Sequence, residues 1–392
     1  MKKFSVITIL IFCFITVSSQ SCLPDGIWFG SQAQIDSFQI NYPGCTEILG
    51  NVTIYGGDII NLSGLIGITS IGGDFIIDRV DSLTCLDGLD SLILVQGHLD
   101  IGNFFHTGQH GNLSLSNINS LGNLISVGGH LGIYANSNLT SLEGLNQLTS
   151  IGDDLLIIEN PALVNLYGLN NLISIGGSLL ICFNPLNNLT GFDSLNSIEG
   201  DLLVLGMSNL TSLTGLENLT TINGELQIGG WNPGYGGNPL LTSLSGLNNV
   251  SAESIVDLTI KYNHSLSFCD IQSICDYLIA PNGEVSIAAN APGCNSPEEV
   301  QDSCEANVGY IDMKFSKDDI FIYPNPASQE LNISAEGFNI DEVEIYTLTG
   351  QKVFNVTPKS ETIDISPLPP GMYIVEVTVE VRKVRRKLLV ER

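Results

Sequence analysis

The middle of the chain repeats a short pattern in which an apolar residue, any residue and a second apolar residue follow one another. Alternation of this kind predicts a short strand with its first and third side chains turned inward. The triplets recur at a spacing of about 24 residues, except for two longer steps. The nine triplets begin at Val52, Phe75, Leu99, Leu131, Leu155, Leu179, Leu202, Leu226 and Leu258. Such regular spacing indicates one structural unit repeated along the chain.

A repeat of this length predicts a solenoid. One short unit cannot bury its own apolar face, so successive units must stack and share a continuous core. The two long steps carry extra residues, 104–111 and 231–238, which predict inserted loops because they are rich in Gly and polar residues. The expected fold is therefore all-β, a solenoid with cysteine-containing caps followed by a small C-terminal β-sandwich.

Glycines stand two residues before most triplets and predict a corner of the coil. A tight corner requires either a positive φ or a close approach between backbones, and glycine permits both. The positions are Gly50, Gly73, Gly97, Gly129, Gly177, Gly200 and Gly224. We expect each coil to turn there.

The second part of most repeats reads L-T-S-L-x-G-L, which supplies another wall of the coil. The pattern is clearest at residues 139–145, 210–216 and 241–247. Together with the preceding I-G-G-x-L-x-I it resembles the receptor L domain over residues 45–304. That family is related to leucine-rich repeats, and the resemblance implies a right-handed β-helix.

The resemblance also implies an asparagine at the turn after each strand, where its side chain satisfies backbone groups. Four coils have it, as Asn136, Asn160, Asn184 and Asn263. Four others place Val80, Phe104, Met207 and Trp231 there. We therefore expect an incomplete asparagine ladder with looser corners in those coils.

Charge is distributed unevenly along the 392 residues, whose net charge is -27. Residues 22–310 contain 28 acidic side chains and only two basic ones, Arg79 and Lys261. Such a surface repels phosphate and anionic lipid, so the sequence argues against nucleic acid as a partner. Divalent cations or cationic surfaces fit better, and solubility alone is the simpler interpretation.

The start of the chain, positions 1–19, predicts a secretory signal peptide. Lys2 and Lys3 precede an apolar run, residues 4–17, that is too short to cross a bilayer. A lipoprotein interpretation would use Cys22, but Ser19 stands where such signals usually have Leu. The sequence contains no other candidate transmembrane segment. The remaining divisions expected are an N-terminal cap at 20–47, the solenoid at 48–268, a C-terminal cap at 269–305, a linker at 306–319 and a last domain at 320–392.

Export leaves eight cysteines in an oxidising compartment, where disulfides are expected. Cys22 and Cys45 flank a predicted helix at 32–38 with Ser31 as its N-cap, and a bridge there would seal one end of the solenoid. Four more cysteines, which allow three pairings, form the other cap: Cys269, Cys275, Cys294 and Cys304. This cluster has no CxxC pair and no histidine, which argues against zinc. Cys85 and Cys182 lie about four coils apart and are expected to be separate thiols.

The end of the chain, positions 320–392, has a different pattern. Short alternating runs at 331–333, 343–348 and 372–379 with Pro and Gly turns predict a small sandwich. The order Y-P-N-P-A, I-Y-T-L-T-G-Q-K-V, L-P-P-G-M-Y-I-V-E-V and K-V-R-R-K-L-L-V resembles the sorting domain of the type IX secretion system. The motif residues are Tyr323, Pro324, Asn325, Pro326, Gly350, Gly371 and Tyr373.

This second resemblance implies a Bacteroidetes-type bacterium, contact with the secretion machinery and a secreted or outer-surface location. The basic residues of the last motif could suggest nucleic-acid binding: Arg382, Lys383, Arg385, Arg386 and Lys387. A solvated face of the final strand is the better interpretation, because the whole chain is acidic.

A partner surface is predicted where the outward residues of three consecutive triplets are apolar. The middle residue and the residue after each triplet should face outward. The candidate binding residues are Tyr134, Leu156, Ile158, Leu180, Leu203 and Leu205, with Cys182 among them. Exposed apolar patches usually have a role, although a loop or the linked sandwich could cover this one.

The column just before the triplets stacks carboxylates and imidazoles, including Asp74, His98, His130 and Asp154. Like charges about 4.8 Å apart would repel, and Ca²⁺ or another metal would relieve this. Two stacked histidines lack the spacing of known ligand motifs, so a solvated polar column is favoured. We expect no metal or cofactor.

Catalytic signals are weak. The Gly-rich segment 229–237 does not open a helix, and no nucleophile elbow occurs. A polysaccharide lyase would need basic residues in one groove, whereas Arg79 and Lys261 belong to opposite ends. The sequence favours a non-enzymatic recognition or adhesion protein that binds a protein or a glycan on the solenoid. Its alternatives are a carbohydrate-active β-helix enzyme and a structural surface component, and the ligand and the oligomeric state are left open.

Overall fold

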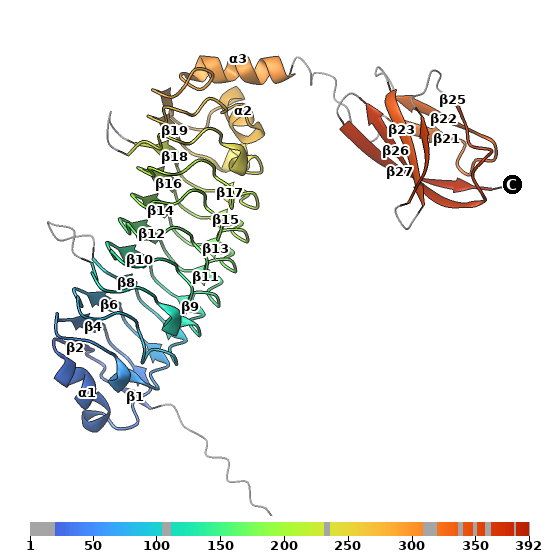
Figure 1. Ribbon diagram of the computed structural model, residues 1–392. Helices are drawn as coiled ribbons and strands as arrows, with labels where there is room; N and C mark the ends of the chain where they lie inside the picture. Colours follow the sequence, from blue (N-terminus) through green and yellow to red (C-terminus); the bar gives the residue numbers. More distant parts are fainter. Residues whose placement is uncertain are drawn as a thin grey trace, which may run out of the picture. The chain divides into compact units, whose positions relative to one another are not determined.

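The computed structural model describes residues 20–103, 111–230, 236–308, 320–335, 340–347, 351–356, 362–379 and 382–391 (Figure 1). The predicted leader and Gly350 lie outside these residues, as do 104–110 and 231–235 of the two insertions. Contacts divide the chain into two compact units, Met1–Cys304 and Glu305–Arg392. In the described part of the chain no helix is long and apolar enough to cross a membrane.

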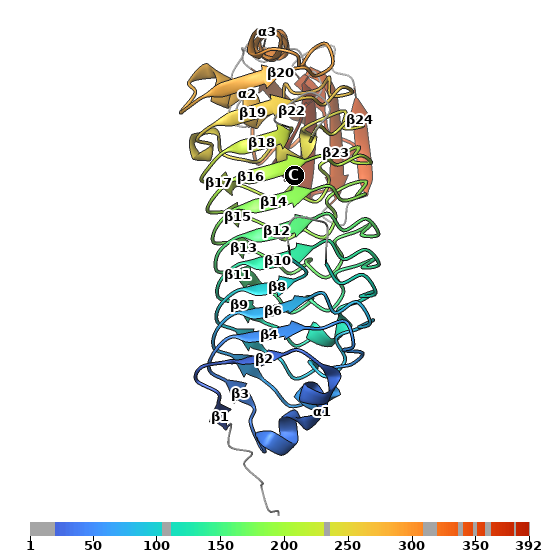
Figure 2. The same ribbon diagram turned by 90° about the vertical axis from the view of Figure 1, so that its left-hand side faces the viewer.

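The first unit is a stack of coils with one large parallel sheet. All nine predicted triplets form neighbouring strands in register, so that Leu155 pairs with Leu179 and Leu179 with Leu202. Two further strands extend the sheet to eleven. In order they are β2 (Ile27–Phe29), β4 (Val52–Tyr55), β6 (Phe75–Asp78), β8 (Leu99–Ile101), β10 (Leu131–Tyr134), β12 (Leu155–Ile158), β14 (Leu179–Cys182), β16 (Leu202–Leu205), β18 (Leu226–Gly229), β19 (Leu258–Lys261) and β20 (Val285–Ala288). Figure 2 shows the outer face of this sheet.

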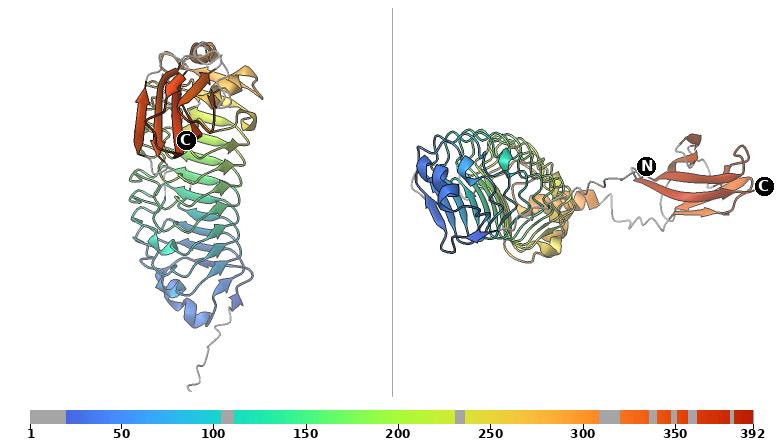
Figure 3. Two further views of the ribbon diagram at one scale, coloured as in Figure 1. Left: turned by 90° about the vertical axis from the view of Figure 1, so that its right-hand side faces the viewer. Right: turned by 90° about the horizontal axis from the view of Figure 1, so that it is seen from below.

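A second parallel sheet forms another side of the coil from strands of two residues each, just before the glycine corners. Its nine strands are β1 (Ser21–Cys22), β3 (Glu47–Ile48), β5 (Ser70–Ile71), β7 (Leu94–Val95), β9 (Ser126–Val127), β11 (Ser150–Ile151), β13 (Ser174–Ile175), β15 (Ser197–Ile198) and β17 (Thr221–Ile222). The L-T-S-L-x-G-L segments form the remaining wall with turns, and short 3-10 helices occur at Ser63–Leu65, Asn119–Leu121, Ser245–Leu247 and Ala252–Ser254. Seen from below, the coils enclose one shared interior (Figure 3).

The interior is apolar and mostly aliphatic along the whole stack. In one coil Leu139, Leu142, Leu155 and Ile157 are all fully buried, and the other coils repeat this arrangement. Each coil therefore shields the apolar side chains of its neighbours, which a single unit could not do. The structure confirms the predicted solenoid-like, mostly β fold.

Glycine is needed at these corners because the backbones of neighbouring coils approach closely there. None of the seven predicted glycines, all within the described residues, has a positive φ. A Cβ on Gly73 would lie 2.8 Å from the backbone nitrogen of Asn51 in the preceding coil, so a larger residue would push the coils apart. The left-handed turn occurs instead just after most large-sheet strands, for example at Glu159 and Phe183, whose φ angles are 57° and 58°.

The asparagine ladder is more complete than the sequence predicted. The insertions displace the asparagine along the chain to Asn112 and Asn238, and Asn290 adds a further member. Two runs result, Asn112–Asn136–Asn160–Asn184 and Asn238–Asn263–Asn290. The corners at Val80 and Met207 are held as well, because their backbone N–H groups donate to Asn112 and Asn238 at 3.2 and 3.0 Å. The expectation of looser corners there was wrong.

Both ends of the stack are capped and cross-linked. Helix α1 (Gln32–Asn41) buries Ile35 and Phe38 at one end, beside the Cys22–Cys45 disulfide. Ser31 does not cap it with its side chain, and the N–H of Gln32 donates to Asp58 instead. Helices α2 (Gln272–Ile279) and α3 (Pro297–Val308) form the other cap, with pairs Cys269–Cys294 and Cys275–Cys304. Cys85 and Cys182 are free thiols, as predicted.

The second unit consists of two antiparallel sheets. One contains β21 (Ile320–Tyr323), β22 (Glu330–Ala335) and β25 (Thr362–Asp364). The other contains β24 (Lys352–Val356), β23 (Ile340–Thr347), β26 (Gly371–Val379) and β27 (Arg382–Val390). Side chains of both sheets, such as Leu331 and Val375, meet in one buried core. Helix α3 continues as far as Val308, into the segment expected to be linker.

The motif residues of this unit join its strands. Asn325 donates to the carbonyl of Lys387 at 2.8 Å and accepts from the N–H of Leu389 at 2.9 Å. The hydroxyl of Tyr373 donates to the carbonyl of Pro369 at 2.8 Å. The basic strand β27 is not simply solvated, because the Arg385 guanidinium donates to the buried carboxylate of Glu376 at 2.6 Å.

Candidate functional site

The predicted apolar residues come together on the outer face of the large sheet. Tyr134, Ile158, Cys182 and Leu205 form a cluster against which Leu156, Leu180, Leu203 and Phe183 pack. We call this set the outer apolar cluster. It lies on strands β10 to β16, in the middle of the face seen in Figure 2, and is separate from the interior core.

The exposure of this cluster differs from the prediction. Tyr134, Ile158 and Leu205 are at most 3% exposed, and Cys182 is 6% exposed. Leu156, Leu180 and Leu203 are partly exposed, as an outward position requires. The ring of Tyr134 lies across Gly132 of its own strand, where a Cβ would approach the ring to 2.1 Å. The sequence pattern therefore correctly predicted that these residues lie together, but it overestimated their solvent exposure.

Burial changes the chemistry of two polar groups in the cluster. Burial, followed by the nearby charges of Asp100 and Asp154, raises the pKa of the Tyr134 hydroxyl. Burial also raises the pKa of the Cys182 thiol to about 12, with a smaller contribution from Glu159. Both groups are therefore held in the protonated form at neutral pH, which disfavours the reactive thiolate of Cys182.

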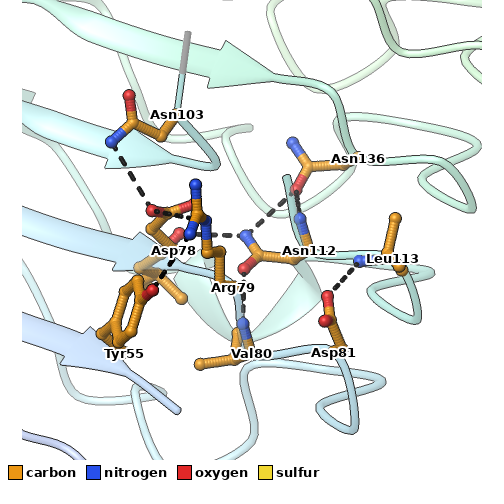
Figure 4. Close-up of polar contacts among 10 residues, drawn as sticks. Tyr55, Asp78, Arg79, Val80, Asp81, Asn103, Asn112, Leu113 and Asn136 are labelled. Carbon is orange, nitrogen blue, oxygen red and sulfur yellow. Dashed lines mark hydrogen bonds and ion pairs between the residues drawn. The ribbon is translucent and has the colours of Figure 1, made fainter. Parts of the chain in front are cut away.

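A polar cluster lies on the same face beside β6 and β8 (Figure 4). The Arg79 guanidinium donates to the Tyr55 hydroxyl at 3.1 Å and lies 4.0 Å from the carboxylate of Asp78. Asn103 donates to the same carboxylate at 3.5 Å. Asp78 is 3% exposed, which the sequence did not reveal, because it belongs to an outward column. The guanidinium thus neutralises a buried charge and holds Tyr55.

The other basic residue, Lys261, ends strand β19, whereas Arg79 follows β6, far along the same sheet. The two cannot act on one ligand group. This arrangement agrees with the expectation that they belong to opposite ends.

The column before the strands is held by hydrogen bonds between coils. The Asp74 carboxylate accepts from the N–H of His98 at 3.0 Å, and His98 Nδ1 accepts from the N–H of His130 at 2.9 Å. In later coils Asp154 accepts from the N–H of Ser178 in the same way. These side chains bind backbone, which removes the reason to invoke a cation. Within the described residues, no three His, Cys, Asp or Glu side chains gather as a metal site would require.

The two stacked histidines differ in their partners. Their rings lie 3.9 Å apart, and His130 Nε2 lies 2.8 Å from the Asp100 carboxylate. This hydrogen bond raises the pKa of His130, although partial burial acts in the opposite direction. The stacked histidines and Asp100 therefore connect neighbouring coils on the outer face. The sequence did not single out Asp100.

A pocket of about 280 Å³ opens at the corner beyond strands β14 to β19. Phe183 and Tyr262 both line it, and each holds a left-handed backbone conformation. Gly206, Gly237, Ser208 and His264 also line it. No pattern in the sequence indicated this pocket, because its residues are spread over several coils.

Comparison with protein families identifies the second unit. Residues 321–391 match the secretion system C-terminal sorting domain, which spans β21 to β27 and leaves the coils outside the match. A comparison with curated proteins finds no match. The sorting domain indicates export by the type IX secretion system and a secreted or cell-surface location.

Proposed function

We propose that this protein is an exported, non-enzymatic recognition protein that binds a protein or a glycan on the outer face of its large sheet. Export brings the coils to the cell surface or the medium, where recognition takes place. The resemblance of the repeats to the receptor L domain supports the same role. Ten steps between eleven strands, about 4.8 Å each, give a face about 48 Å long.

The outer apolar cluster carries this proposal. Core packing does not require apolar residues on the outer side of the sheet, since the interior side chains already fill the core. Leu156, Leu180 and Leu203 present a partly exposed row on three consecutive strands. Rows of this kind on a rigid sheet are typical anchors for a partner.

The arrangement of the charged groups favours binding over catalysis. Arg79 is engaged with Asp78 and Tyr55, so it is poorly suited to take a proton from a sugar. Lys261 lies too far along the sheet to join it. A carbohydrate-active β-helix enzyme is therefore the weaker alternative, and a purely structural surface component would leave the outer leucines without a role.

Array binding tests the proposal. The full chain is labelled and applied to an array of glycans and extracellular proteins, beside the variants Leu180→Asp and Ile173→Asp. Ile173 is 53% exposed, and its N–H and carbonyl bond the neighbouring coils next to β13, away from the outer cluster, so it is the matched control. We expect binding that Leu180→Asp abolishes and Ile173→Asp preserves. Binding that survives Leu180→Asp, or no binding to any array component, would refute the proposal.

A further inference from the structure

The corner beyond most large-sheet strands has one residue in the left-handed conformation, usually just before the ladder position. Gly206 meets this need without strain, and Ala135 and Ala289 with a small side chain. Four coils place a larger residue there: Arg79 and Glu159, with φ 50° and 57°, and the aromatic residues Phe183 and Tyr262, with φ 58° and 62°. Bulky residues are disfavoured in this region, and such outliers cluster at functional sites. The turn itself gives no reason for an aromatic side chain.

Both aromatic residues line the same pocket, and glycines lie between them. Phe183 follows β14 and Tyr262 follows β19, three strand steps apart, which is about 14 Å along the stack. A Cβ on Gly206 would lie 2.3 Å from the Phe183 ring, so the ring lies directly against the glycine backbone. Gly206 N–H donates to the carbonyl of Gly236 at 2.6 Å, which joins two glycines of the pocket wall. Part of the pocket wall is thus backbone between two aromatic side chains.

The described residues that line the pocket include no Asp, Glu, Lys or Arg. This is unusual in a part of the chain, residues 22–310, that has 28 acidic side chains. An anion would find no cationic partner there, and a cation would find no carboxylate. The polar groups available are the hydroxyls of Ser208 and Tyr262 and the imidazole of His264.

We propose that this pocket binds a short, neutral oligosaccharide, and we call it the aromatic corner pocket. The C–H face of a sugar ring packs on an aromatic ring by dispersion, and its hydroxyls exchange hydrogen bonds with hydroxyl and imidazole groups. A pocket of about 280 Å³ that spans three strand steps fits more than one sugar ring of a chain but not a folded partner. The inference rests on the proposed recognition function and assigns it a ligand class and a second position on the same unit.

Calorimetric titration of the full chain with neutral hexasaccharides tests this assignment. The probes are maltohexaose, cellohexaose, mannohexaose and chitohexaose, with hexagalacturonate as the anionic contrast. At least one neutral probe should bind, and hexagalacturonate should not. Heat from hexagalacturonate alone, or from none of the probes, would overturn the proposal.

The variant Tyr262→Gly locates the site, and Phe183→Gly tests the other aromatic wall, whose ring also packs against the outer apolar cluster. Glycine adopts a positive φ without strain, so neither change should unfold the coil, and thermal unfolding checks this. Each should weaken binding of the neutral probe by about tenfold or more. Tyr167→Gly, at a 48% exposed tyrosine outside the pocket, should leave the affinity unchanged. Wild-type affinity in both pocket variants would place the sugar elsewhere.

The outcome also separates this proposal from the recognition function. Array binding that depends on Leu180, together with no binding of any hexasaccharide, would leave the outer apolar cluster as the recognition site and reject the pocket. Hexasaccharide binding that depends on Tyr262 but not on Leu180 would confirm the pocket, and the array binding of Leu180→Asp then decides separately whether the outer apolar cluster is a recognition site.

Discussion

The inner and outer faces of the large sheet are made by the same strands, yet their sequences behave differently. Inward residues are apolar in every coil, and Ile157 and Ile181 are fully buried. Outward residues change from Thr53 through Asp100 and Leu180 to Gln227 along the sheet. Stacking demands the same residue class at every inward position, whereas it places little demand on the outward ones. The changing outward columns are therefore where a specific function can reside.

The asparagine ladder resembles the inward positions in that the same residue type recurs from coil to coil, although it is polar. Asn160 is fully buried, and its amide oxygen accepts from Asn136 at 3.1 and 3.2 Å. Its amide nitrogen donates to the carbonyls of Ile133 and Ile158 at 3.0 and 3.1 Å. Constancy along the repeat marks a structural role for polar as well as apolar residues.

The largest effect is expected at this ladder. Asn160→Ala should lower the free energy of unfolding of the coils by about 4 kcal/mol, because several buried backbone groups lose their partners at once. Urea denaturation followed by circular dichroism measures it. Asn165→Ala removes only an amide oxygen that accepts from the N–H of Tyr167 near the surface, and should lower it by less than about 1 kcal/mol. Equal losses in the two variants would show that the ladder adds nothing beyond a local turn.

The second unit satisfies its buried polar groups with ion pairs, whereas the coils use asparagine amides. Glu376 is 2% exposed, and Arg385 is its guanidinium partner. Arg385→Leu should lower the melting midpoint of this unit clearly, because a buried carboxylate is left without its cation. The double variant Arg385→Leu with Glu376→Leu should recover most of the loss, as calorimetry can measure.

Lys387→Leu is the control for this ion pair. It removes the same charge from the same strand at an exposed position. Its midpoint should change little. Two results would contradict a specific role for the Arg385–Glu376 ion pair in stability. One is a loss of melting midpoint in Lys387→Leu as large as in Arg385→Leu, and the other is a double variant that melts no higher than Arg385→Leu.

A smaller, pH-dependent effect is expected at His130. The Asp100 carboxylate raises the pKa of His130 in the folded protein, so the stabilisation is complete below the ordinary histidine pKa, about 6.5. It is lost as pH rises through the raised folded value. The difference in unfolding free energy between wild type and His130→Asn should be roughly 1 kcal/mol or less and should shrink above neutral pH. A difference that grows with pH would contradict the ion pair.

Much of the fold could be predicted from the sequence because every coil must bury the same inward apolar positions against its neighbours. The spacing of the triplets predicted every strand of the large sheet from β4 to β19, and their register followed from stacking Leu on Leu. Strands β2 and β20 were missed because cap sequences depart from the repeat. Asn112 and Asn238 were missed because each insertion moves the asparagine along the chain without moving it in space.

The candidate site was predicted less well, for a physical reason. Columns tell which side chains share a face, and they correctly joined Leu156, Leu180 and Leu203. They do not show how much neighbouring side chains shield one another from solvent, so the burial of Tyr134 and Leu205 was missed. The aromatic corner pocket was also missed, because its lining residues are spread over several coils and share no pattern in the sequence.

The most direct test of the account compares two adjacent residues of β14 that face opposite ways. Ile181 is fully buried in the interior, whereas Leu180 is partly exposed on the outer face. The measurement is thermal unfolding of the full chain with either Ile181→Asp or Leu180→Asp. We predict that Ile181→Asp unfolds the coils while Leu180→Asp melts close to wild type. If Leu180→Asp unfolds them equally, the outer face is a second core and not a surface for recognition.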